Sequence, residues 1–177
     1  MCDLTTGRSV PCKDVVGGIK AVYFANYGDL GAVTYDVANT DAIDSFAGTP
    51  TAYEYDVKGN SSFEQTITSS RENGTTFFEQ TLNLTFTKLD KATNKELKLM
   101  AYGRPHVFVE DYNGNVFVMG LEHGAEVTGG TVVTGAAMGD LSGYTLTLTA
   151  QEKVPANFLD TTLSAAGVSV SATQINP

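Results

Sequence analysis

The stretch that most constrains the fold is residues 60–87, which reads as two β-strands around the turn Arg71-Glu72-Asn73-Gly74. In the second strand, apolar and polar residues largely alternate, with Phe78, Leu82, Leu84 and Phe86 on one face and Phe77, Glu79, Thr81, Asn83 and Thr85 on the other. A period of two is typical of a strand with one buried face. The pattern therefore predicts a long β-hairpin with one apolar face and one polar face.

Such a hairpin is longer than a small domain needs to close its own core. An uncovered edge strand presents unpaired N–H and C=O groups that recruit another chain. We therefore expect a second copy of this chain to complete the edge, and the polar face to line a solvated space.

The composition predicts a mainly β chain with a single domain. The 177 residues are 42% hydrophobic, enough for one sizeable core, and they include eighteen glycines and no tryptophan. Residues 1–177 are interpreted as one domain, in which 1–17 form an N-terminal arm, 18–153 a β body and 154–177 a C-terminal arm. The last segment is too poor in large apolar residues to form a core alone.

Further strands are predicted from hydrophobic runs, at residues 19–27, 33–37, 51–57, 106–112, 116–120, 126–134 and 144–150. Residues 28–50 otherwise read as a surface connection, and Asn113-Gly114 predicts a tight hairpin turn. One helix is expected over 90–102, with Thr93 and Glu96 as a capping box and Leu97 and Met100 on its apolar side. The expected fold is a β-sandwich or half-barrel with one short flanking α-helix, a long β-hairpin and extended terminal arms.

The charge balance argues against a nucleic-acid-binding protein. Eleven Lys and Arg residues face twenty Asp and Glu residues, for a net charge of −9. Gripping a phosphate backbone requires clustered cations, whereas an acidic surface lets nucleic acid slide past. The first residues do not resemble a secretory signal and no apolar run is long enough to span a bilayer, so we expect a cytosolic protein without a membrane partner.

No residue pattern predicts catalysis, a cofactor or a metal. Cys2 and Cys12 lack two further ligands nearby, and Ser142 lies outside a Gly-x-Ser-x-Gly elbow. Residues 111–115 with Glu122 resemble a calcium loop, but Val116 occupies its glycine position and strands flank it. The pair Glu64 and Glu79 reads as solvated charge. The sequence therefore predicts a protein that is not an enzyme.

Several motifs together resemble virion proteins of tailed bacteriophages, most nearly the tail tube (major tail) protein family. They are Leu4-Thr5-Thr6-Gly7-Arg8, Val16-Gly17-Gly18-Ile19-Lys20 and Gly135-Ala136-Ala137-Met138-Gly139-Asp140-Leu141-Ser142-Gly143-Tyr144, the last followed by alternating Leu and Thr. The resemblance implies hexameric rings that stack into a tube for DNA passage, assembled in the host cytoplasm and located in the virion. It also implies that the partners are other copies of the chain and other tail or neck proteins, with DNA as cargo that does not stick.

Combined with the strand pattern, this resemblance selects two groups of candidate residues. The candidate lumen-facing residues are Glu64, Thr66, Thr68, Glu79, Thr81, Thr145, Thr147 and Thr149. The candidate inter-subunit or stacking residues are Arg71, Glu72, Asn73 and Gly74.

Two other classes of protein stay open. One is a capsid decoration or head-tail connector (neck) protein, which would form a trimer or a single ring. The other is a monomeric β-sandwich ligand-binding module, which needs a concave apolar pocket. The sequence shows no exposed aromatic cluster that would predict such a pocket.

Overall fold

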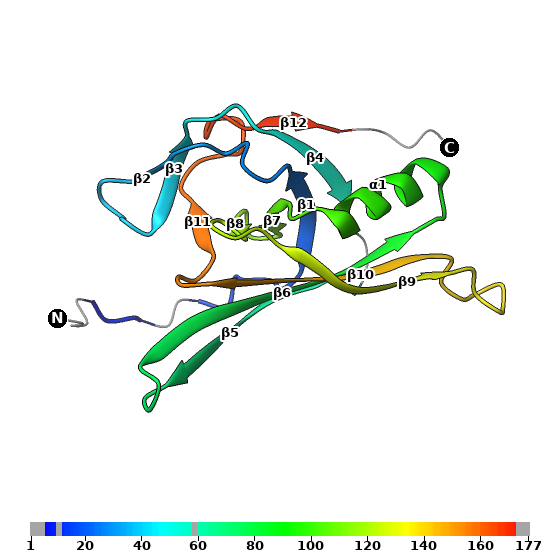
Figure 1. The fold of residues 1–177 in the computed structure, drawn as a ribbon, viewed down its shortest axis with the longest axis horizontal. Helices are drawn as coiled ribbons and strands as arrows, with labels where there is room; N and C mark the ends of the chain where they lie inside the picture. Colours follow the sequence, from blue (N-terminus) through cyan, green and yellow to red (C-terminus); the bar gives the residue numbers. More distant parts are fainter. Residues whose placement is uncertain (1–5, 10–11, 58–59, 173–177) are drawn as a thin grey trace.

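The computed structural model describes residues 6–9, 12–57 and 60–172, and it shows two β-sheets and one helix (Figure 1). The larger sheet has eight strands in the order β12-β4-β1-β7-β8-β11-β3-β2, and the smaller has four in the order β5-β6-β10-β9. The larger sheet is formed by β1 (Ile19–Ala25), β2 (Val33–Tyr35), β3 (Ala42–Phe46), β4 (Thr51–Asp56), β7 (His106–Asp111), β8 (Val116–Met119), β11 (Asn157–Leu159) and β12 (Ser169–Ser171). The smaller is formed by β5 (Ser62–Ser70), β6 (Thr75–Thr87), β9 (Glu126–Val133) and β10 (Gly143–Glu152). The prediction of a mainly β fold with one short helix is confirmed.

The larger sheet is buried on both faces. Val22 and Phe24 of β1 pack in a core shared with Leu82 and Leu84 of the smaller sheet. Ala21, Tyr23 and Ala25 of the same strand belong to a second core, on the opposite face, with side chains from β3, β7, β8 and the segment after β11. Because alternate residues of a strand point to opposite faces, β1 must be apolar on both sides.

The long hairpin of residues 60–87 is confirmed as β5 and β6, joined by the predicted turn. The pairing runs from Ser62 opposite Asn83 to Ser70 opposite Thr75, and Gly74 takes a φ of 63°, which favours glycine. On the other side of β6, pairing with β10 ends at Phe78 opposite Glu152. The end of the hairpin therefore extends beyond β10 as a two-stranded projection, which Figure 1 shows at one end of the smaller sheet.

Residues 28–50 are more than a surface connection. They contain β3 as well as β2, and β3 pairs in parallel with β11, with Phe158 opposite Ala42. Ile43 and Phe46 of β3 lie in the second core. The segment is thus an integral part of the larger sheet, because its partner strand comes from more than a hundred residues further along the chain.

Residues 154–172 do not form the expected C-terminal arm. β11 and β12 extend the larger sheet, and Leu163, Ala166 and Val168 between them are buried in the second core. The Phe46 N–H also donates to the Ala166 carbonyl. Small apolar residues suffice here because they fill space beside an existing sheet; residues 173–177 lie outside the described part.

The helix α1 (Lys91–Tyr102) begins one residue later than predicted and has a different N-cap. The Asp90 carboxylate accepts the N–H groups of Ala92 and Thr93, so Thr93 lies inside the helix and the Thr93–Glu96 capping box is wrong. The helix ends at Tyr102, as predicted, and Gly103 is its C-cap. Leu97 and Met100 pack against the core between the sheets, which confirms the predicted apolar side.

The N-terminal residues 12–17 are exposed and are held at one point. Asn113, in the turn between β7 and β8, accepts the Val16 N–H through Oδ1 at 3.0 Å and donates Nδ2 to the Val16 carbonyl at 2.7 Å. Asp111 in turn accepts the N–H groups of Asn113 and Asn115, which explains the calcium-like spacing as a turn. Cys12 is exposed, and Cys2 lies outside the described residues.

Candidate functional site: the polar face and edges of the four-stranded sheet

The register of the smaller sheet places the predicted lumen-facing residues on one face. Glu64 pairs with Thr81, which pairs on its other side with Thr149. The buried Leu82, Leu84 and Leu146 lie on the opposite face of the same sheet. The other candidates fall on this polar face by the same alternation: Thr66, Thr68, Glu79, Thr145 and Thr147.

This polar face carries hydroxyls, amides and carboxylates, with Phe77 opposite Thr68 as an aromatic exception, but no cation. None of the strands β5, β6, β9 and β10 contains a lysine or an arginine. Thr147 donates its hydroxyl to Asn83 Oδ1 at 2.9 Å, and the hydroxyls of Thr131 and Thr145 lie 2.6 Å apart. The side chains thus link neighbouring strands while leaving the face polar and free of positive charge.

Sequence reasoning missed the contribution of β9 to this face. Thr131 lies opposite Thr145, and Glu126 lies opposite Thr149. A register shift between Thr147 and Leu148, together with Gly129-Gly130, interrupts the alternation along β9. In the sequence, two glycines precede Thr131 and two valines follow it. This stretch is too short to show on which face of the sheet Thr131 lies.

Both edges of the smaller sheet are open among the described residues, since no strand lies beyond β5 or β9. In β6, Thr85 donates its N–H to Ser61 Oγ on the β5 side, whereas Lys88 donates its N–H to the Ser142 carbonyl on the β10 side. Along an antiparallel strand, successive backbone N–H groups point alternately toward one neighbouring strand and toward the other. By register, the β5 residues that point their N–H groups away from β6 are Phe63, Gln65, Ile67 and Ser69.

The two ends of the smaller sheet carry exposed turns that point in opposite directions (Figure 1). The predicted stacking residues Arg71, Glu72, Asn73 and Gly74 are all exposed at one end. At the other end, Asp140 accepts the N–H groups of Ala136 and Ala137, and these hydrogen bonds hold the pKa of its carboxyl below the usual value. This ordered loop presents a fully exposed Met138.

A cavity of about 340 Å³ opens between the sheets beneath β5, and Ile19, Phe63, Gln65 and Phe117 are among its lining residues. The rings of Phe117 and Phe158 pack at a tilt of 47° with centroids 4.6 Å apart, and Phe158 is 49% exposed. The structure therefore contains a partly exposed aromatic cluster that the sequence analysis did not find. The three rings come from β5, β8 and β11, so no local pattern unites them.

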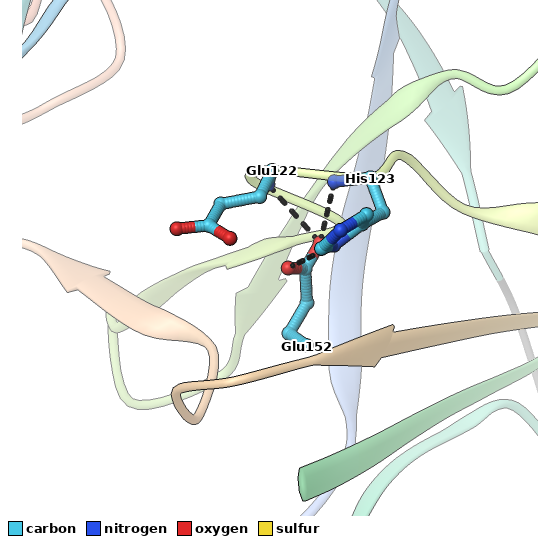
Figure 2. Close-up of side chains that lie close together, drawn as sticks. All are labelled: Glu122, His123 and Glu152. Carbon is cyan, nitrogen blue, oxygen red and sulfur yellow. Dashed lines mark hydrogen bonds and ion pairs between the residues drawn. The ribbon is translucent and has the colours of Figure 1, made fainter.

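A second polar cluster, Glu122, His123 and Glu152, joins β10 to the turn before β9 (Figure 2). Glu152 is buried, and its Oε1 accepts the N–H groups of Glu122 and His123 while its Oε2 lies 2.9 Å from His123 Nδ1. A Glu122 carboxylate oxygen lies within 4.8 Å of the ligand atoms of His123 and Glu152, and Figure 2 draws no hydrogen bond from it to either side chain. The buried carboxylate is thus fully hydrogen-bonded and holds this turn.

On the larger sheet, Glu110 accepts hydrogen bonds from Lys20 and from the Tyr23 hydroxyl. Burial opposes the charged carboxylate, but these two donors hold the pKa of Glu110 below its usual value. Burial and the neighbouring Glu110 raise the pKa of Tyr23. The group ties β1 to β7 and contributes no free nucleophile or base.

Comparisons with family models, with curated proteins and with solved structures give no match to this chain. Within the part of the chain that the structure describes, no helix is long and apolar enough to cross a membrane.

Proposed function

We propose that the chain is a virion structural protein that assembles into stacked rings, forming a tail tube through which DNA passes. The observation that supports it most strongly is the four-stranded sheet: its outer face has no cation in any strand, and both its edge strands lack a partner among the described residues. The resemblance to the tail tube family, stated above, supplies the class of assembly.

The edges give a physical reason for a ring. β5 and β9 stand at opposite edges of one sheet, so β5 of one copy can pair with β9 of the next. Because the two edges differ, this contact is heterologous, and repeating it by rotation closes a ring. The sheets of all copies would then form one continuous barrel wall.

The face gives a reason for DNA passage. A duplex carries one negative charge about every 1.7 Å, and each protein cation that contacts a phosphate releases counterions and strengthens binding. A wall of threonine hydroxyls with Glu64, Glu79 and Glu126 offers no such contact. The proposed lumen is therefore the outer polar face of the smaller sheet, with the larger sheet on the outside.

The projecting turns give a reason for stacking. The hairpin end with Arg71 to Gly74 and the loop with Met138 extend from opposite ends of the smaller sheet. If the strands run from one rim of the ring to the other, these two ends lie on opposite rims. Each ring then meets the next through one type of turn on each side.

Negative-stain electron microscopy of the purified protein tests the proposal. We expect long tubes with a central channel. Discrete single rings or trimers would contradict the tube and favour the capsid decoration or head-tail connector class. Monomers at all concentrations would contradict assembly altogether and direct attention to the cavity beneath β5.

A further inference from the structure

The chain contains two exposed Asn-Gly turns, and their asparagine side chains differ in hydrogen bonding. Asn73-Gly74 lies at the end of the β5–β6 hairpin, and Asn113-Gly114 joins β7 to β8. Both glycines have positive φ, 63° and 85°, and a side chain at either glycine would meet no neighbouring atom within 4 Å. The two sites thus share the Asn-Gly pair, exposure and a positive φ at glycine, and they differ in their hydrogen bonds.

The Asn113 side chain is held on both of its polar atoms. Its Oδ1 accepts the Val16 N–H at 3.0 Å, and its Nδ2 donates to the Val16 carbonyl at 2.7 Å and to Asp111 Oδ2 at 3.3 Å. The N–H of the following glycine, Gly114, donates to the Asp111 carbonyl at 3.2 Å. The side-chain amide carbon of Asn113 and the backbone nitrogen of Gly114 are therefore both held in place in the turn.

The Asn73 side chain makes no hydrogen bond with any residue that the structure describes, and neither does the Gly74 N–H in the turn. Only the backbone N–H of Asn73 is engaged, through Ser70 Oγ at 3.3 Å. The turn also lies beyond the last pair between β6 and β10, so only β5 and β6 restrain it.

We propose that Asn73 is a site of spontaneous deamidation and that Asn113 is protected from it. The Gly74 nitrogen attacks Cγ of Asn73, the Cγ–Nδ2 bond breaks, and ammonia leaves as a five-membered succinimide forms. Water then opens either carbonyl of the ring, giving aspartate or isoaspartate. Glycine favours the first step because it has no side chain to shield its nitrogen.

The modification changes the charge of the hairpin end. Arg71 and Glu72 balance each other in the unmodified turn, and a carboxylate at position 73 adds one negative charge per copy. Isoaspartate also lengthens the main chain inside the turn. The reaction needs only water, so it does not depend on the assembly proposed above.

The test follows the two asparagines within one sample. The folded protein is incubated at mildly alkaline pH and then cleaved after glutamate, which isolates residues 73–79 and 111–122 for mass spectrometry. A parallel sample in denaturant gives the rate of each peptide without structure. In denaturant we expect comparable rates for the two peptides.

In the folded protein we expect the 73–79 peptide to deamidate at least about tenfold faster than 111–122, because Asn113 must first break its hydrogen bonds. Equal slowing of both peptides by folding, or faster reaction of 111–122, would overturn the proposal. Asn73→Gln should abolish the mass change in its peptide. Val16→Pro, which removes one donor to Asn113, should speed 111–122 and leave 73–79 unchanged; an unchanged 111–122 rate would overturn the protective role of Val16.

Discussion

At the scale of single residues, the hydrogen bonds of buried His106 determine which of its ring nitrogens carries the proton. Its Nε2 accepts the Gly28 N–H at 3.1 Å, so Nδ1 carries the proton that bonds the Gly120 carbonyl at 2.7 Å. Burial lowers the pKa of His106 below 6.5 and outweighs the opposing effects of the Gly120 carbonyl, Glu152 and Asp29. The ring stacks on Tyr27, which closes it from solvent.

This arrangement predicts a stability that falls on mild acidification. The unfolded histidine binds a proton more readily than the folded one, so the contribution is complete above the unfolded pKa of 6.5 and is lost as the pH falls below it. Chemical unfolding between pH 7.5 and pH 5 should show this decline, and His106→Gln should flatten it. The carboxyls with lowered pKa, Glu110 and Asp111, act at lower pH, below about 4. An unchanged slope in His106→Gln would contradict the assignment.

The helix start gives a second prediction at this scale. Asp90→Ala should lower the free energy of unfolding by about 1 kcal/mol, because the Ala92 and Thr93 N–H groups lose their acceptor. Glu96→Ala is the matched control, since Glu96 is exposed within the helix and caps nothing. Urea unfolding distinguishes the two. A larger loss from Glu96→Ala than from Asp90→Ala would restore the sequence-based capping box.

At the scale of elements, the sequence predicted the strands that carry a clear hydrophobic run or alternation, whether or not their partners are close in the chain. The β5–β6 hairpin and its turn, and the turn between β7 and β8, were predictable because alternation and turn residues are local signals. β3 and β12 were missed because each is short and pairs in parallel with a distant strand, β11 and β4 respectively. The polar face was predictable on β5, β6 and β10, where alternation is regular, and not on β9, where a bulge breaks it.

The open edge of β5 gives an element-scale prediction. Ile67→Pro removes an N–H that points away from β6, so the internal ladder and the fold should persist while assembly is lost. Ile67→Thr keeps that N–H and is the control. Proline at Thr81 or Asn83 would not test the edge, because both residues lie in the central strand β6 and bond β5. Microscopy and thermal unfolding provide the readouts, and normal tubes from Ile67→Pro would exclude β5 as the interface.

At the scale of the whole molecule, the cations lie outside the strands of the smaller sheet. The net charge is −9, and cations near the smaller sheet, such as Arg71, Lys88 and Lys153, stand beyond the strand ends. The larger sheet closes its second core with residues 154–172. Both sheets end in edge strands without a partner among the described residues, β12 and β2 in the larger and β5 and β9 in the smaller, and the smaller sheet has the longer edge strands.

The lumen assignment predicts the effect of adding charge. Glu79→Lys with Thr81→Lys should leave tube formation intact, because both side chains are only half-buried, while the tubes acquire DNA binding that weakens as salt rises. Thr40→Lys, in the exposed connection between β2 and β3, is the control for added charge elsewhere. Duplex DNA retention by tubes at increasing salt is the measurement. Equal retention by the control and the double variant would contradict the inward orientation of this face.

The most direct measurement of the proposed assembly is hydrogen exchange of the β5 amides, compared between unassembled protein and tubes. The N–H groups of Phe63, Gln65, Ile67 and Ser69 point away from β6, whereas those of Glu64, Thr66 and Thr68 already bond it. If strand addition forms the ring, the first group should become strongly protected on assembly while the second changes little. Tubes in which the Ile67 and Ser69 amides exchange as fast as in the unassembled chain would contradict it.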